Sequence, residues 1–169
     1  YTLQDLSKQV SLTRMNMTPP DRMTVREFVS LGRTPYAGVF DGRSAEDEAV
    51  IEQSMESLDV KRFAGRAVCE LSDGERTRVY LAEAIAQSVN VLLLDEPNAF
   101  LDIPRSHALF RTLRSLAASR GMGIVVSTHS VEYALRYADR IMVIDGGEVK
   151  VAAAGSAEQS GLLDWARAD

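Results

Sequence analysis

The sequence has little of what marks several protein classes. Cys69 is its only cysteine, so an internal disulfide bond is impossible. No apolar run approaches the roughly 20 residues that cross a bilayer, and residues 1–5 lack the basic and apolar regions of a signal peptide. What is present is globular composition, with 46% hydrophobic and 25% charged residues. The 169 residues predict one domain or a large piece of one.

Positive charge is also scarce. The chain has 19 Lys and Arg against 24 Asp and Glu, and only three of the basic residues are lysines. A net charge of -5 gives no electrostatic reason to expect nucleic acid as a partner. Because no apolar run is long enough to cross a bilayer, any association with a membrane would have to come through a partner protein.

The first part of the chain, residues 1 to about 70, predicts short helices with irregular connections. A capping box that begins at Thr24 predicts a helix ending near Gly32. Pro and Gly residues predict a loop over 34–42. A second helix begins at 44–47, and its spacing of Ile, Met and Leu at 51, 55 and 58 indicates one buried face. Its acidic residues indicate a solvated face.

The second part, residues 71 to about 152, alternates helices with short apolar strands. The expected order is helix 72–88, strand 91–94, a helix from about 104, strand 124–126, helix 130–138 and a hairpin of strands 141–144 and 148–152. Apolar strands separated by helices indicate a parallel sheet covered on both faces. Ligands of such sheets bind at the carboxyl ends of the strands. Asp95, Glu96 and His129 lie at such ends.

The adjacent carboxylates Asp95 and Glu96 directly follow four apolar residues. Unpaired charge is costly to bury, so a cation or a cleft is expected beside them. The first carboxylate suits Mg²⁺ together with phosphate oxygens. The second can polarise a water for attack on a phosphoryl group. The alternative is a strand that simply ends in a polar loop.

Three further positions each have a structural and a functional interpretation. Ser72-Asp73-Gly74-Glu75 is a capping box, and the helix N-terminus it begins also offers N–H donors to an anion. His129 is either a structural histidine or a contact to a terminal phosphate. Asp102 predicts the N-cap of the next helix, and it can also contact a neighbouring subunit.

The combination of these motifs is far more specific for one protein family than any motif alone. Leu-Ser-Asp-Gly-Glu, then Leu-Leu-Leu-Asp-Glu-Pro, Phe-Leu-Asp and Ser-Thr-His occur in this order over residues 71–129. The chain thereby resembles the nucleotide-binding domain of ABC ATPases, over about residues 8–152. The resemblance implies an α/β fold of the P-loop NTPase type: a parallel sheet flanked by helices, with an α-helical subdomain. It implies a helical and signature subdomain at about 15–85, a RecA-like part at about 86–152 and a tail at 153–169.

The resemblance also implies a role for each motif. ATP and Mg²⁺ would be the cofactors, with Asp95 as metal ligand, Glu96 as catalytic base and His129 on the γ-phosphate. Ser72 to Glu75 corresponds to the signature motif and Asp102 to the D-loop, which would face the nucleotide of a second, identical subunit. The dimer would drive a transmembrane permease. The protein would then be peripheral, on the cytoplasmic side of the inner membrane.

Within the family, residues 23–29, 32–36 and 100–103 most resemble importers of ferric siderophores, haem or cobalamin. One alternative is a DNA-maintenance ATPase of the same superfamily, but about 55 residues between Met15 and Leu71 leave no room for its coiled coil. A third hypothesis is a degenerate, non-catalytic subunit that regulates a partner.

The chain departs from the family pattern in two main ways. None of the lysines follows a glycine, so the P-loop G-x-x-x-x-G-K-[ST] is absent. We expect its strand and loop to precede Tyr1, which would make this chain a fragment, incomplete at its N-terminus and inactive alone. Met15 occupies the position of the family's Q-loop glutamine, and a thioether cannot replace an amide as a Mg²⁺ ligand. Four lesser departures replace the family's usual residues: Asp73 stands for a glycine, Glu75 for a glutamine, Asn98 for a threonine and Ser130 for an acidic residue.

Overall fold

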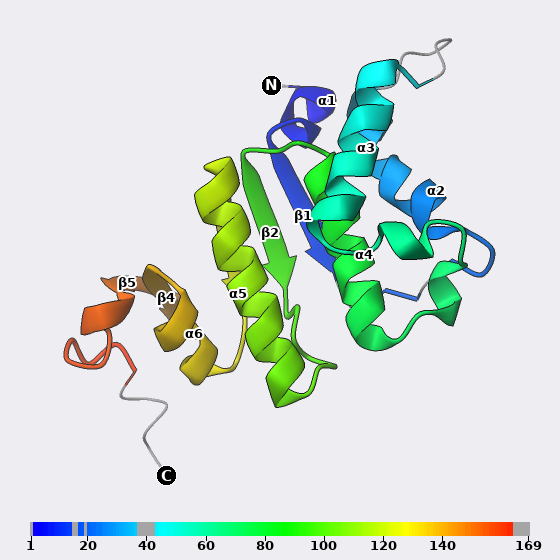
Figure 1. Cartoon of the computed structure of the whole chain (residues 1–169). Coiled ribbons are helices and arrows are strands. Elements are labelled where there is room, and N and C mark those ends of the chain that lie inside the picture. The colour runs from blue at the N-terminus through cyan, green and yellow to red at the C-terminus, as the bar shows by residue number, and fades with distance from the viewer. Residues whose placement is uncertain (1, 15–16, 19, 37–42, 164–169) are drawn as a thin grey trace.

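A computed structural model describes residues 2–14, 17–18, 20–36 and 43–163 of the chain (Figure 1). Met15, the expected Q-loop position, and most of the expected loop 34–42 lie outside the described residues. None of the described helices is both long enough and apolar enough to cross a bilayer.

A three-stranded parallel sheet forms the centre of the fold. Its strands β1 (Val10–Arg14), β2 (Val91–Asp95) and β3 (Gly123–Ser127) are ordered β1-β2-β3. Their register places Leu12 beside Leu93 and Leu93 beside Val125. Strand β1 is a correction, because the sequence predicts only helices over residues 1–70. Its partner lies about 80 residues later, so no local pattern identifies the pairing.

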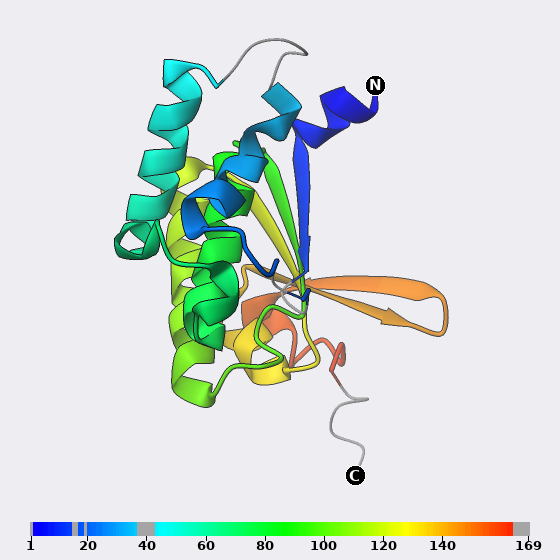
Figure 2. The same ribbon diagram turned by 90° about the vertical axis from the view of Figure 1, so that its right-hand side faces the viewer.

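Helices cover one face of this sheet. Helix α4 (Asp73–Ala86) and helix α5 (Ile103–Arg120) pack there. Figure 2 shows both on the same side of β1–β3, together with α2 (Val25–Ser30) and α3 (Ala45–Ser57). On the opposite face Leu12 and Val125 remain 60% and 55% exposed. The predicted cover on both faces is therefore wrong for the described residues. Only the short helix α1 (Leu3–Ser7) lies toward that side, near the start of β1 (Figure 2), and it leaves these side chains exposed.

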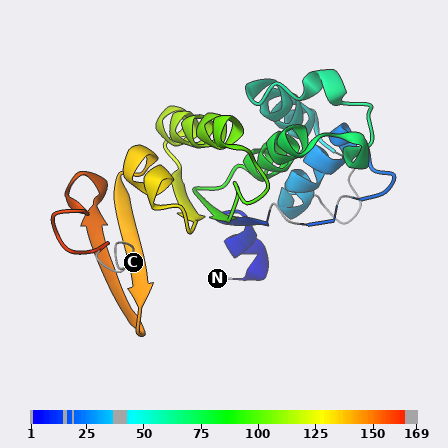
Figure 3. The same cartoon turned by 90° about the horizontal axis from the view of Figure 1, so that it is seen from below.

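The hairpin of β4 (Arg140–Asp145) and β5 (Glu148–Ala153) is a separate antiparallel sheet. The hairpin itself is as predicted, but β4 does not join the parallel sheet. It follows β3 through the short helix α6 (Val131–Tyr137), and Figure 3 shows it at one end of the molecule. Strand β3 thus keeps one edge without a partner strand among the described residues.

The helical part begins with α1 (Leu3–Ser7) and continues with α2 (Val25–Ser30) and α3 (Ala45–Ser57) after β1. The predicted capping box at Thr24 is present, and Ser44, where the second helix was expected to begin, forms another. The loop predicted from residue 34 is wrong for residues 34–36, which complete a 3-10 helix, η1 (Leu31–Tyr36). Short 3-10 turns η2 (Lys61–Phe63), η3 (Val68–Glu70) and η4 (Ala154–Ser156) complete the chain.

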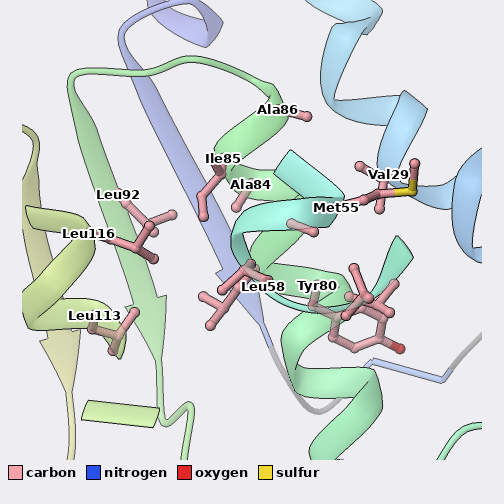
Figure 4. Close-up of a cluster of buried hydrophobic side chains, with 14 of the residues drawn as sticks. Val29, Met55, Leu58, Tyr80, Ala84, Ile85, Ala86, Leu92, Leu113 and Leu116 are labelled. Atoms are coloured by element: carbon pink, nitrogen blue, oxygen red, sulfur yellow. The ribbon is translucent and has the colours of Figure 1, made fainter. Parts of the chain in front are cut away.

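One hydrophobic cluster joins the helical part to the sheet. Figure 4 shows helix α4 between the two: Val29 and Met55 lie on one side of it, and Leu92 and Leu116 on the other. These four side chains are at most 6% exposed. Packing on both sides therefore fixes the position of α4 between the helical part and the sheet.

Candidate functional site

The acidic pair lies at the carboxyl edge of the sheet, where β2 and β3 end together. Asp95 and Ser127 are register partners in adjacent parallel strands. The Ser127 hydroxyl donates a hydrogen bond to Asp95 Oδ1 at 2.7 Å and accepts one from the backbone N–H of Glu96 at 3.0 Å. A single hydroxyl thus links both acidic residues to the neighbouring strand.

Glu96 turns the chain out of β2. Its φ of 44° lies in the left-handed region, which costs a non-glycine residue roughly 1 kcal/mol or more. The N–H of Ala99 donates to the carbonyl oxygen of Glu96 at 3.2 Å and closes the turn. This turn carries the Glu96 carboxylate to His129, whose Nδ1 lies 3.5 Å from Glu96 Oε1. Both side chains are largely exposed, at 54% and 76%, so they are open to a ligand.

A second contact ties the two loops together beyond the strands. The Thr128 hydroxyl donates to Asn98 Oδ1 at 3.4 Å and accepts from the N–H of Ser130 at 3.1 Å. Ser130 precedes α6 without a capping bond from its own side chain. The loops that carry Glu96 and His129 are therefore joined at two places.

The segment from Ser72 to Glu75 forms the N-terminus of α4. The N–H and hydroxyl of Ser72 both donate to Glu75 Oε2, at 3.0 and 2.8 Å. The backbone bond from Ser72 is the main reason that the pKa of Glu75 lies below its usual range. Asp73 forms an ion pair with Arg76. The unusual acidic residues of this motif are therefore held by partners within their own helix.

Asp102 caps α5 as predicted, with its Oδ1 accepting from the N–H of Arg105 at 2.9 Å. Arg105 Nε also lies 3.6 Å from Asp102 Oδ2. The Arg105 side chain reaches α4, where a Cβ added to Gly74 would lie 3.3 Å from Arg105 Cδ. Arg105 thus connects the segment around Asp102 to the N-terminus of α4.

The structure accordingly forms two groups from the predicted residues. Asp95, Glu96 and His129 gather at the sheet edge, and residues 72–75 meet Asp102 through Arg105. Ser127 and Arg105 were not among the predicted site residues. Their sequence signals are weak: Ser127 precedes His129 by two residues, and Arg105 follows Asp102 by three.

The chemistry of the sheet edge suits a phosphate ligand with a hard cation. The described residues contain no group of three or more His, Cys, Asp and Glu side chains placed to hold a metal ion. Asp95 instead offers one carboxylate, with the Ser127 hydroxyl beside it. Mg²⁺ is commonly bound by one or two carboxylates together with substrate phosphates and waters, so this donor set fits it.

Comparisons of the sequence with known proteins find ABC transporter ATP-binding proteins. An uncharacterised ABC transporter ATP-binding protein of Methanocaldococcus jannaschii is 35% identical over 146 residues, which cover 86% of this chain and 50% of the relative. A hemin import ATP-binding protein of Rhodococcus jostii is 37% identical over 149 residues, covering 88% and 50%. A cobalamin import ATP-binding protein of Halobacterium salinarum is 38% identical over 154 residues, covering 88% and 38%. The chain thus spans about half the length or less of these curated relatives.

The solved structures that resemble this fold also come from ABC transporters. The chain superposes on a putative metal-chelate type ABC transporter in an inward-facing conformation with a TM-score of 0.84 and 24% identity, covering 93% of this chain and 64% of the other. A dimeric bacterial ABC transporter cassette gives a TM-score of 0.71 at 26% identity, covering 91% and 68%. The family model described as ABC transporter matches residues 1–99 of the 169, and the chain therefore belongs to the ABC transporter family.

Proposed function

We propose that this chain is part of the ATP-hydrolysing subunit of an ABC importer for iron-siderophore, haem or cobalamin-type solutes. The observation that carries the proposal is the convergence of Asp95, Glu96 and His129 at the carboxyl edge of the sheet. An adjacent pair of carboxylates and a histidine from the next strand, meeting at this edge, are typical of a phosphate-transfer site. The relatives named as import proteins for haem and cobalamin support the solute class.

In this proposal each residue of the sheet edge has one task. Mg²⁺, when bound, would neutralise charge on the phosphates, and Asp95 would hold it directly or through water. Glu96 would orient the attacking water and accept its proton. His129, beside Glu96, would contact the γ-phosphate and respond to its loss.

The N-terminus of α4 would serve the nucleotide of a second, identical subunit. Ser72 is exposed at that end, where the helix dipole favours an anion, and Gly74 beside it is half-buried against Arg105. Asp102 lies nearby, and Phe100 and Ile103 beside it are 67% and 69% exposed. Exposed apolar side chains around a polar motif suit a subunit interface. The paired subunits would drive a permease and remain peripheral on the cytoplasmic side of the inner membrane.

What the proposal requires in addition is a phosphate-binding loop. No G-x-x-x-x-G-K-[ST] occurs in this sequence, so we propose that another segment of the full-length protein supplies it and that this chain alone does not hydrolyse ATP. The uncovered face of the sheet and the unpartnered edge of β3 offer that segment room to pack. The same absence is the observation that favours the second candidate, a regulatory subunit without activity.

The decisive experiment replaces Glu96 by Gln in the full-length protein. We expect ATP to bind as in the wild type, while steady-state hydrolysis falls at least about 100-fold, because the proton acceptor is lost. Glu148→Gln, an exposed glutamate of β5, is the matched control and should leave the rate unchanged. Unchanged hydrolysis in Glu96→Gln would refute the catalytic role. Failure of the wild type to bind ATP would favour the regulatory subunit.

A further inference from the structure

Ser127 occupies a position that the proposed mechanism does not use. It is the last residue of β3 and lies beside Asp95, the last residue of β2. Its hydroxyl donates to Asp95 Oδ1 at 2.7 Å and accepts from the N–H of Glu96 at 3.0 Å. The hydroxyl thus uses its donor and an acceptor position on two consecutive residues that would have different chemical tasks.

The two bonds have different consequences. The bond to Oδ1 holds the Asp95 carboxylate toward β3 and fixes its orientation. The bond from the Glu96 N–H stabilises a backbone that is unfavourable by itself, because the φ of Glu96 is 44°. With that backbone conformation the Glu96 carboxylate lies at His129, with its Oε1 3.5 Å from Nδ1 of the histidine.

We propose that Ser127 is a positioning residue that separates the two carboxylates, keeping Asp95 on the sheet and Glu96 at His129. The inference rests on the proposed function and deepens it. Ser127 would act through both acidic residues and touch neither nucleotide nor water. Loss of its hydroxyl would leave the Glu96 turn without its anchor, and a displacement of about 1 Å in a reacting group can cost about 100-fold in rate.

The contact is tested first in the full-length protein, without any nucleotide. Ser127→Thr keeps the hydroxyl. Ser127→Val introduces a side chain of nearly the same shape as Thr but without the hydroxyl, and both β-branched residues suit a strand. Hydrogen exchange of the Glu96 amide, followed by NMR, should be slow in the wild type and in Ser127→Thr. It should be about tenfold faster in Ser127→Val. Equal exchange in the wild type and Ser127→Val would overturn the proposed anchor.

The consequence for turnover is tested in the full-length protein. Ser127→Val should lower kcat for ATP about tenfold or more and leave KM within about twofold, and Ser127→Thr should restore most of kcat. A merely structural role would lower the melting temperature without splitting kcat from KM. If the Thr and Val variants have the same kcat, whether unchanged or equally lowered, the inference is refuted. If Glu96→Gln hydrolyses ATP normally, the proposed function fails instead, whatever the exchange experiment shows.

Discussion

Gly32 shows how a single residue sets the distance between two helical segments. It lies in η1 against α4, where an added Cβ would overlap the carbonyl oxygen of Glu83 and lie 3.0 Å from the backbone N of Gln87. Both neighbours are backbone atoms of a helix, which cannot move aside as a side chain can. Gly32 therefore permits a close approach that any other residue would prevent.

We expect Gly32→Ala to lower the free energy of unfolding by about 2 kcal/mol, as overpacking against a rigid neighbour does. Gly65→Ala is the matched control. Nothing lies within 4 Å of a Cβ at Gly65, so that variant should unfold within about 0.5 kcal/mol of the wild type. Urea denaturation followed by circular dichroism measures both. Equal stability of the two variants would show that η1 does not press on α4 in solution.

At the scale of an element, α4 connects the site to the core. Its first turn carries Ser72 to Glu75, and its body is buried between α2 and α3 on one side and the sheet on the other (Figure 4). Glu83, a charged residue of α4, lies within this packed region. Burial raises the pKa of the Glu83 carboxyl to about 7, from an ordinary value of 4.5.

This shift predicts a pH dependence of stability. The folded chain binds the Glu83 proton more tightly than the unfolded chain, so stability falls as pH rises from about 4.5 through about 7. Glu83→Gln, which is neutral at every pH, should be more stable than the wild type by about 2 kcal/mol at pH 8. The difference should shrink toward zero at pH 4.5. Urea midpoints at the two pH values measure it, and a pH-independent difference would contradict a buried carboxylate.

At the scale of the whole molecule, apolar side chains remain exposed at two places. The uncovered side of the sheet presents Leu12 and Val125, and the β4–β5 hairpin presents Met142, Ile144 and Val149, each at least 55% exposed. Exposed apolar surfaces favour association with other protein molecules, because association removes them from water. The described chain should therefore be prone to self-association in solution.

Replacing Leu12 and Val125 together by Thr tests this expectation, because Thr keeps the strand propensity and removes apolar area. We expect the double variant to bind less of the dye ANS and to sediment as a smaller species than the wild type. Leu31→Thr, at a 44% exposed position of η1 away from the sheet face, is the control and should behave as the wild type. Identical dye binding in all three proteins would argue that the face is covered in solution.

Much of the local structure follows from the sequence alone. The caps at Thr24, Ser44 and Asp102 were predictable because each depends on a hydrogen bond to a residue three positions away. Strand β2 and its acidic end were predictable from one apolar run. The motifs of the site were predictable from their order, while the roles of Asp95, Glu96 and His129 stay predictions until they are measured.

The tertiary structure decided everything that depends on which strands pair. Pairing of β1 with β2 joins Val10 to Val91, and pairing of β2 with β3 places Ser127 beside Asp95. The separation of β4 from the parallel sheet and the open face of β1–β3 also depend on which strands pair. A local pattern specifies dihedral angles and which face of an element is apolar, but strand order depends on contacts between residues far apart in the sequence. The acidic pair is therefore visible in the sequence, and its anchor at Ser127 is visible only in the fold.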